Sequence, residues 1–520
     1  MKKYTTLVWI VALVLGWGFD FLFWRKPVGI NFAIFLTACL LGGMLVLLAN
    51  GLKPSFKSLG LVVPFVFFAV ITAVRQEPLT MFLGYTFTLI SLGLLAVTYL
   101  GGRWSHYSLF DYCKNFFLLI GSILILPFGF IKQTKPDVSG IQRLPLKPVA
   151  RGLLIAIPVV VFFAVLLAAG DRVFSQQITN FFNLFEANRI PEYFLRLIII
   201  LFWAYVLTGI YLHAALKSRD EKLVGEDKPV IKQFLGFTEA AIVLGSVSIL
   251  FLIFVIIQFR YFFGGEVNIG VKGYTYSEYA RSGFSELISV ACFSLLMILG
   301  LGSITRRESD REKRVYSGLS VGIVALVIVI LVSAYQRLML AIDWHGFSRL
   351  RLYPRVFLIW VGILFVAVIV LEIIHRERFF ALAVVLACLG FAASLSAINV
   401  DAAIARHNIY RTVEGKHFNV NYLSSLSSDA IPVLAAAFMD PSLPSGTHDG
   451  VGAALLCYMH YDEYENYSAP DWRSFNYSRW RAVEALNSVR EDLHAYRVLD
   501  WMSPIQVETP DHQLQYLCDR

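Results

Sequence analysis

Charged side chains near the ends of the predicted membrane helices are the residues best placed to do chemistry. A charge at membrane depth is costly, so such residues usually face a bundle interior or a wet cavity. The alternative is that these long side chains pair at the interface or reach out to water. We predict a polar cluster that binds an anionic head group or fixes loops to the C-terminal tail, built from Arg260, Glu278, Arg281, Glu286, Arg337 and Arg351.

Local spacing supports this cluster. If their segment is helical, Glu278 and Arg281 can pair on one face, because they lie three residues apart. Glu286 opens an apolar run, where a carboxylate favours the positive end of a helix. Arg349 falls on the same predicted face of the membrane as Arg337 and Arg351.

The tail offers a second set of reactive side chains. Cys457 and His460 would share a helical face and could supply two metal ligands. The alternative is a solvated acidic helix end, and we predict no metal and no cofactor. Cys457 and Cys518 could instead form a disulfide if the tail is extracytoplasmic. The chain has no Gly-rich nucleotide motif and no triad of catalytic type.

The elements that position these residues must be membrane helices. The chain is 57% hydrophobic and only 16% charged, which excludes an ordinary soluble enzyme. Uncharged runs of about 20 residues predict about twelve spans in an all-α transmembrane bundle. These runs are Tyr4 to Phe19, Pro27 to Leu52, Ser58 to Val74, Leu79 to Gly102, Asn115 to Ile131, Gly152 to Gly170, Leu197 to Leu216, Ala240 to Phe259, Leu287 to Ile304, Val315 to Gln336, Val356 to Leu371 and Phe379 to Val400.

Two segments need separate interpretation. The first run follows Lys2 and Lys3, as a signal peptide would, but it lacks a small-residue cleavage pattern and is predicted to span. Asp171 to Phe185 is too short and polar to cross, so we predict that it lies at the interface. Three loops of five Lys or Arg each, at 132–151, 217–232 and 306–314, predict the cytoplasmic face. Twelve spans would then leave both termini outside.

The charge balance changes near residue 400. Residues 401–520 carry nine Lys or Arg against sixteen Asp or Glu, a net charge of −7, whereas the preceding residues carry +15. We therefore predict a transmembrane domain at 1–400 and an acidic, soluble α-helical tail domain at 401–520. Apolar residues at helical spacing predict three antiparallel helices there, within 422–438, 451–459 and 480–493. The basic charge suits anionic lipid, and we expect no nucleic acid partner.

Two stretches of the chain resemble a known family. The first runs through Thr275, Tyr276, Glu278, Tyr279, Ala280, Arg281, Gly283 and Phe284. The second is matched at Gly346, Arg351 and Tyr353, but has Phe347 and Ser348 where Leu and Thr are usual. They resemble a bacterial integral-membrane family known only as a domain of unknown function, the four-one-seven-three type, with its four-one-five-three relatives. The resemblance implies a shared membrane architecture and no reaction.

Three classes of function remain open for a multi-pass protein of the bacterial cytoplasmic membrane. We favour a non-enzymatic structural, sensory or assembly component of the envelope. The alternatives are a secondary transporter or flippase, and a membrane-embedded transferase acting on lipid-linked substrates. The expected partners are membrane lipids, including anionic head groups, and a protein bound through the tail.

Overall fold

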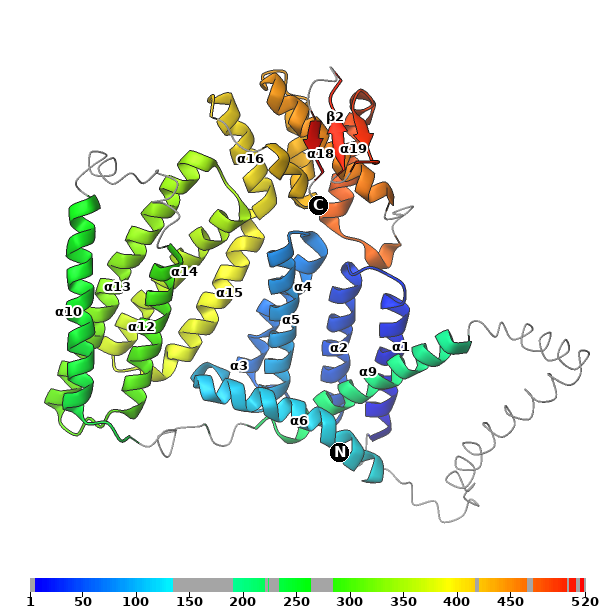
Figure 1. Ribbon diagram of the computed structural model, residues 1–520. Helices are drawn as coiled ribbons and strands as arrows, with labels where there is room; N and C mark the ends of the chain where they lie inside the picture. The colour runs from blue at the N-terminus through cyan, green and yellow to red at the C-terminus, as the bar shows by residue number, and fades with distance from the viewer. Residues whose placement is uncertain are drawn as a thin grey trace, which may run out of the picture. The chain divides into compact units, whose positions relative to one another are not determined.

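The membrane region is helical in the residues that the structure describes. The computed structural model describes residues 5–133, 190–219, 223, 233–262, 284–416, 420–464, 471–502, 505–510 and 515–518. Within these residues the chain forms sixteen α-helices and one three-stranded sheet (Figure 1). Eleven helical segments are long and apolar enough to cross a membrane. The predicted all-α, polytopic fold is therefore confirmed.

Eleven of the twelve predicted runs fall on these segments. The twelfth, 152–170, and the predicted interfacial segment 171–185 lie outside the described residues. The membrane-length helices are α1 (Thr5–Phe23), α2 (Ile30–Ala49), α3 (Phe56–Leu59) with α4 (Val62–Val74), α5 (Pro78–Thr98), α6 (Leu109–Gln133), α9 (Ile190–Leu216), α10 (Phe237–Phe262), α12 (Phe284–Ile304), α13 (Asp310–His345), α14 (Arg349–Ile373) and α15 (Phe380–Ile398). Two short 3-10 helices, η2 (Trp104–His106) and η6 (Glu377–Phe379), lie in connections.

The chain divides into two compact units. The first holds α1, α9 and most of α2 and α6. Small residues let its helices approach closely: a Cβ on Gly16 would lie 2.4 Å from the carbonyl oxygen of Ile200. The Tyr211 hydroxyl donates to the Cys39 carbonyl at 2.8 Å, and so α9 packs on α2 as well.

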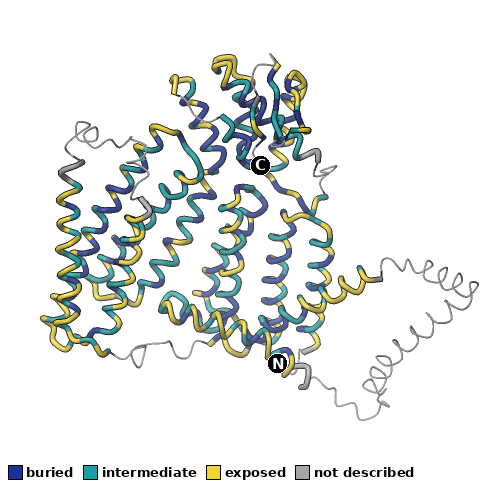
Figure 2. The backbone as a smooth tube through the Cα atoms, viewed as in Figure 1, coloured by how far each residue is buried: buried dark blue, intermediate teal, exposed yellow. Residues whose placement is uncertain are grey.

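The second unit holds the remaining spans and the tail. Its longest helix, α13, has 36 residues and contacts α10, α12 and α14. Residues such as Ile323, Val327 and Ile330 are buried along its length (Figure 2). At 1.5 Å per residue α13 is about 54 Å long, more than a hydrocarbon core of about 30 Å requires. Its charged first turn therefore extends beyond the hydrocarbon core.

The tail differs from the three predicted helices. Residues 422–438, predicted as one helix, are divided among two short 3-10 helices and an α-helix that begins at Ile431, whereas 451–459 and 480–493 each lie within one α-helix. Helix α16 precedes them, and three strands of three residues each follow them. The strands pair antiparallel in the order β1-β2-β3, with Val498 opposite Val507. The tail elements are α16 (Val400–Val413), η7 (Val420–Ser425), η8 (Ser428–Ala430), α17 (Ile431–Phe438), α18 (Ser445–Tyr464), η9 (Trp472–Ser474), α19 (Tyr477–Leu493), β1 (Arg497–Leu499), β2 (Gln506–Glu508) and β3 (Gln515–Leu517).

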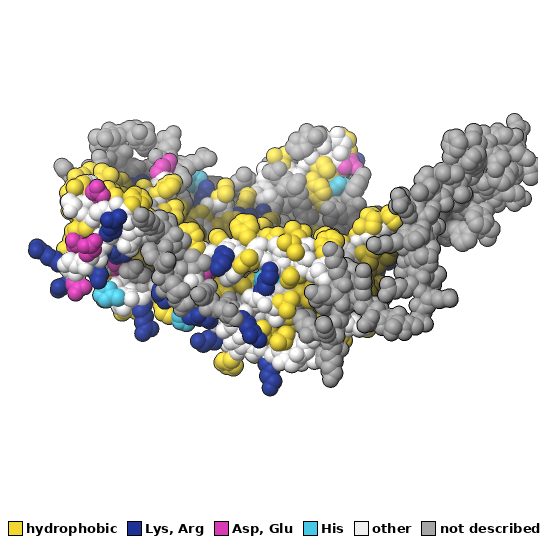
Figure 3. Space-filling model, turned by 90° about the horizontal axis from the view of Figure 1, so that it is seen from below, with side chains coloured by type: hydrophobic (Ala, Val, Ile, Leu, Met, Phe, Trp, Pro, Cys, Tyr) yellow, Lys and Arg dark blue, Asp and Glu magenta, His cyan; other side chains and the backbone are white. Residues whose placement is uncertain are grey.

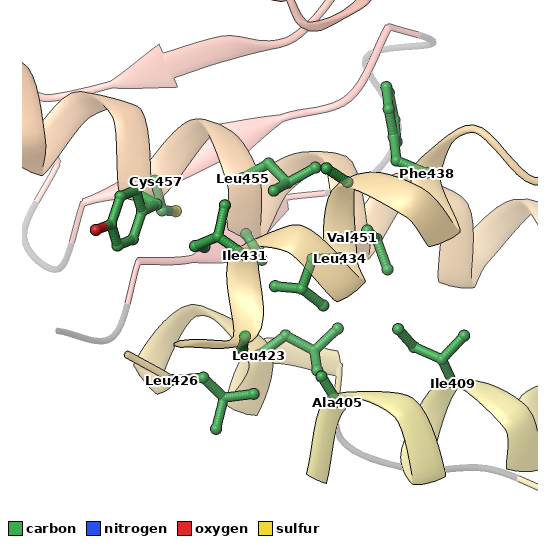
Figure 4. Close-up of a cluster of buried hydrophobic side chains, with 14 of the residues drawn as sticks. Ala405, Ile409, Leu423, Leu426, Ile431, Leu434, Phe438, Val451, Leu455 and Cys457 are labelled. Atoms are coloured by element: carbon green, nitrogen blue, oxygen red, sulfur yellow. The ribbon is translucent and has the colours of Figure 1, made fainter. Parts of the chain in front are cut away.

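The core of the tail is apolar and continues into the membrane helices. Leu423, Leu434 and Leu455 from three tail helices are at most 1% exposed and point toward one another (Figure 4). The same buried cluster includes Val356 of α14 and Leu395 of α15. The predicted boundary between 400 and 401 falls after the first residue of α16, and the tail shares a compact unit with the spans. Its status as a separate domain stays a prediction.

One expectation about topology is wrong. Two termini outside would place the loop between α1 and α2 on the side opposite the tail. Instead Lys26 in this loop pairs with tail residue Asp471 at 2.9 Å, and the Ile30 N–H donates to the Phe475 carbonyl at 2.8 Å. The loop therefore lies on the tail side. The expectation is wrong because it depends on the number of spans between this loop and the tail. One span more or less moves the loop to the other side of the membrane.

Candidate functional site

Buried polar groups gather where the tail meets the ends of the membrane helices. We call this the tail junction, and define it by Arg75 to Glu77, Arg349 and Tyr353 on the membrane side and by Asp401, Asp429 and Asn476 on the tail side. All of these residues belong to the second compact unit. Figure 1 shows α16 to α19 over the ends of α4, α5, α14 and α15.

An ion pair between α14 and α16 is central to the tail junction. Arg349 Nε donates to Asp401 Oδ1 at 2.8 Å, and Arg349 Nη2 donates to Oδ2 at 2.6 Å. This two-point geometry is the strongest way to join guanidinium and carboxylate groups. The Ser427 N–H also donates to Asp401 Oδ2 at 2.7 Å. Because the Asp401 side chain is fully buried, it depends on these donors.

A second tail acid, Asp429, holds the turn between α4 and α5. Its Oδ2 accepts from the N–H groups of Gln76 and Glu77 at 2.8 and 2.9 Å. The Arg75 guanidinium lies 4.0 Å from Oδ1. Burial raises the pKa of Asp429 above its usual value, while the Gln76 N–H and Arg75 oppose that shift. The turn is thus held by a carboxylate that is mostly removed from water.

Glu77 links α5 to α14 from the membrane side. Its carboxylate accepts from the Leu79 and Thr80 N–H groups at 3.0 and 2.7 Å, so it caps α5. Pro78 follows as the first helical residue, where a missing N–H costs nothing. The Tyr353 hydroxyl of α14 donates to the same carboxylate. Glu77 is 1% exposed, so these donors replace its water.

Helix α16 also clamps the turn between α13 and α14. Asn408 accepts from the Phe347 N–H at 2.7 Å and donates to the Phe347 carbonyl at 2.9 Å. Arg411 donates to the carbonyl groups of Ile342 and Trp344 at 2.6 and 3.2 Å, which satisfies the end of α13. Gly346 has φ 78°, and a Cβ there would lie 2.5 Å from Asn408 Oδ1. This turn therefore requires glycine.

The segment before α19 completes the contact. Asn476 Nδ2 donates to the carbonyl groups of Thr72 and Arg75 at 3.3 and 3.1 Å. Arg473 and Lys26 hold the pKa of Asp471 well below its usual value. In all, tail residues bond to the ends of α2, α4, α13 and α14 and to the turn before α5. The arrangement satisfies buried charges and holds these helix ends together.

The structure describes only some of the residues predicted to form a polar cluster, and these make different contacts. Arg260 lies in α10, but its side chain is not among those described, and Glu278 and Arg281 lie outside the described residues. Glu286 is an exposed residue in the first turn of α12. Arg337 donates to Gln258 at 3.0 Å, and Arg351 donates to the Gly346 carbonyl at 3.1 Å. These two bonds are separate, and the cluster as a whole stays a prediction.

The cysteine and histidine pair in the tail does not form a metal site. Cys457 is joined to Cys518 in a disulfide, so it has no thiolate to offer a metal ion. Among the described residues no three His, Cys, Asp or Glu side chains lie close enough to share a metal. The disulfide is one of the three outcomes that the sequence leaves open for Cys457.

Sequence reasoning missed the acids of the tail junction. Glu77 before Pro78 is a recognisable helix start, and this signal could have been used. Asp401 and Asp429 carry no local pattern, because their partners lie 52 and 353 positions away in the chain. Among these groups, Arg349 is the one that the sequence analysis names, without its partner Asp401.

Comparison with known proteins yields one match. A family described as "Domain of unknown function (DUF4153)" matches residues 62–437. That range covers most of the spans together with α16 and α17. The four-one-seven-three type is not shown, so the resemblance is confirmed only for the four-one-five-three relatives. No curated protein and no solved structure matches the chain.

Proposed function

The chain belongs to the DUF4153 family of polytopic membrane proteins, and from this premise we propose that it is a non-enzymatic component of the bacterial envelope. In this proposal it has a structural, sensory or assembly role. It holds the folded tail fixed on the outer surface of the cytoplasmic membrane, where the tail binds a protein partner. The observation that carries the proposal is the tail junction.

Buried charges are a costly way to attach a domain. A flexible tether would need none, and well-packed apolar residues often stabilise as much as a buried ion pair. What Arg349 with Asp401 adds is a single defined geometry. Because one tail joins the ends of several spans, those spans must move together or break bonds to buried groups. This favours a fixed support over a protein whose helices rock during each cycle.

The side of the tail is part of the proposal. A disulfide persists in an oxidising compartment, and Cys457 and Cys518 form one. The basic run 306–314 lies at the opposite end of α13 from the turn that α16 clamps. Positive loops remain in the cytoplasm, and so both features support a tail outside.

A reporter experiment checks this topology. Alkaline phosphatase fused after Arg520 should be active, because it would fold outside the cytoplasm. The matched control is a fusion truncated after Arg376, in the basic turn between α14 and α15, which should be inactive. The reverse pattern would contradict the proposed side.

A complementation experiment tests the function itself. Cells that lack the chain should show an envelope defect, measured as uptake of an excluded dye. Arg349→Met, expressed at equal membrane abundance, should fail to restore the barrier because the tail is released. Arg481→Met removes an exposed arginine within the tail and should restore it. Full rescue by Arg349→Met with a demonstrably released tail would contradict the proposal.

A transporter or flippase is the second candidate, and one ion pair favours it. In the first unit Asp20 of α1 is 2% exposed and pairs with Arg196 of α9 at 2.6 Å. A buried charge within a membrane helix often marks a substrate or proton path. If this candidate is right, Asp20→Asn should abolish function while the tail stays docked.

A further inference from the structure

A charged pocket lies at the end of α13 that faces away from the tail junction. Its volume is about 670 Å³, within the usual range for ligand sites of about 300–1,000 Å³. It is formed between the start of α13 and the end of α14, and Lys and Arg side chains are visible on this face in Figure 3. The lining residues are Gln233, Arg307, Asp310, Lys313, Arg314, Ser317, Glu372 and His375.

The lining groups can hold an anion. Arg307, Lys313 and Arg314 bring three cationic groups to one pocket. Arg307 is fixed at the rim, because it donates to the Gly302 carbonyl at 3.0 Å and lies 4.5 Å from the centre of the Tyr316 ring. The Ser317 hydroxyl and the Gln233 amide add uncharged donors.

Two acids line the pocket as well, and they leave an excess of positive charge. Asp310 pairs with Lys313 at 3.3 Å, and its backbone carbonyl accepts from Arg314 at 3.4 Å. With Glu372 counted and His375 neutral, three cations against two acids leave a net charge of +1. The amino end of α13 adds partial positive charge. This balance suits a singly charged phosphodiester better than a bare cation or a neutral ligand.

Neighbouring apolar residues indicate that the anion is carried by a lipid. Val315, Ile373 and Ile374 adjoin the pocket residues in the chain and are 43%, 62% and 51% exposed. Both helices are membrane-length, so this point lies at the bilayer surface. We propose that the pocket binds the phosphate of an anionic phospholipid in the cytoplasmic leaflet, with the acyl chains along these aliphatic side chains. Basic pockets between membrane helices on this face are a known mode of head-group binding.

The test is a titration of the full-length protein in neutral detergent. Phosphatidylglycerol should raise the melting temperature in a saturable way, while phosphatidylcholine should not. Lys313→Gln/Arg314→Gln should weaken the apparent affinity roughly 30-fold, since each basic side chain near an anionic lipid contributes about a five-fold factor. Both positions are exposed, and circular dichroism would verify that the variant folds.

Matched controls decide the interpretation. Arg311→Gln/Arg378→Gln removes two exposed charges that do not line the pocket, and it should bind phosphatidylglycerol like the wild type. Equal loss in both double variants would reduce the effect to general surface charge and overturn the proposal. Equal binding of the two lipids would also overturn it. Full protection by glycerol 3-phosphate alone would assign the pocket to a soluble phosphate compound and overturn the lipid assignment.

Discussion

Replacing Arg349 with methionine should release the tail from the membrane helices, at a cost of about 3 kcal/mol to the docked state. The change leaves the Asp401 carboxylate fully buried and without its guanidinium partner, while the Ser427 N–H still donates to it. Removing one partner of a buried pair costs about 3–5 kcal/mol. We use the lower end of this range because the Arg349 side chain is 22% exposed, so the pair is not completely removed from water. Limited trypsin digestion and thermal unfolding of the purified protein would measure the loss.

The control for this prediction is Arg481→Met. Arg481 pairs with Glu484 at 3.5 Å on the exposed side of α19, so its loss should cost under about 1 kcal/mol. The prediction also has an internal check. Adding Asp401→Asn to Arg349→Met removes the orphaned charge and should recover part of the stability. If Arg349→Met digests and melts like the wild type, the ion pair does not hold the tail.

The membrane helices were predictable because their signal is local. A run such as Phe380–Ile398 carries no charge along its whole length, and about 20 such residues are enough to cross a bilayer as a helix. The tail helices α18 and α19 were predictable for a similar reason, since their apolar residues recur at helical spacing. The strands were not, because three residues such as Arg497–Leu499 are too short to show any period.

The tail junction was not predictable for a different reason. Its charges look like ordinary helix-end charges until the fold brings them together. Arg349 stands at the start of an apolar run, where a long arginine side chain commonly extends its charged group to water at the membrane interface. Only the packing of α16 against α14 turns Asp401 into its partner. The predicted side of the loop between α1 and α2 is wrong for a related reason. The side of one loop relative to another depends on the number of spans between them, so a single error in that count reverses it.

Removing the disulfide should destabilise the tail by about 4 kcal/mol. Cys457 of α18 and Cys518 after β3 are 61 positions apart, and joining them restricts the unfolded chain. Their sulfur atoms lie in the tail core, so Cys457→Ala/Cys518→Ala keeps the site apolar. The loss should appear as a lower melting temperature and as faster digestion of β3. Cys388→Ala, at an exposed position in α15, is the matched control and should change neither measurement.

The same bond gives a test in intact cells. Without reductant, a membrane-impermeant maleimide should label neither Cys457 nor Cys518, because both sulfurs are joined. After an impermeant reductant and a mild denaturant, both should be labelled, since the tail is proposed to lie outside. Labelling before reduction would show free thiols and contradict the disulfide. Labelling only after the membrane is permeabilised would agree with the disulfide but place the tail inside. The experiment therefore tests the disulfide and the side of the tail separately.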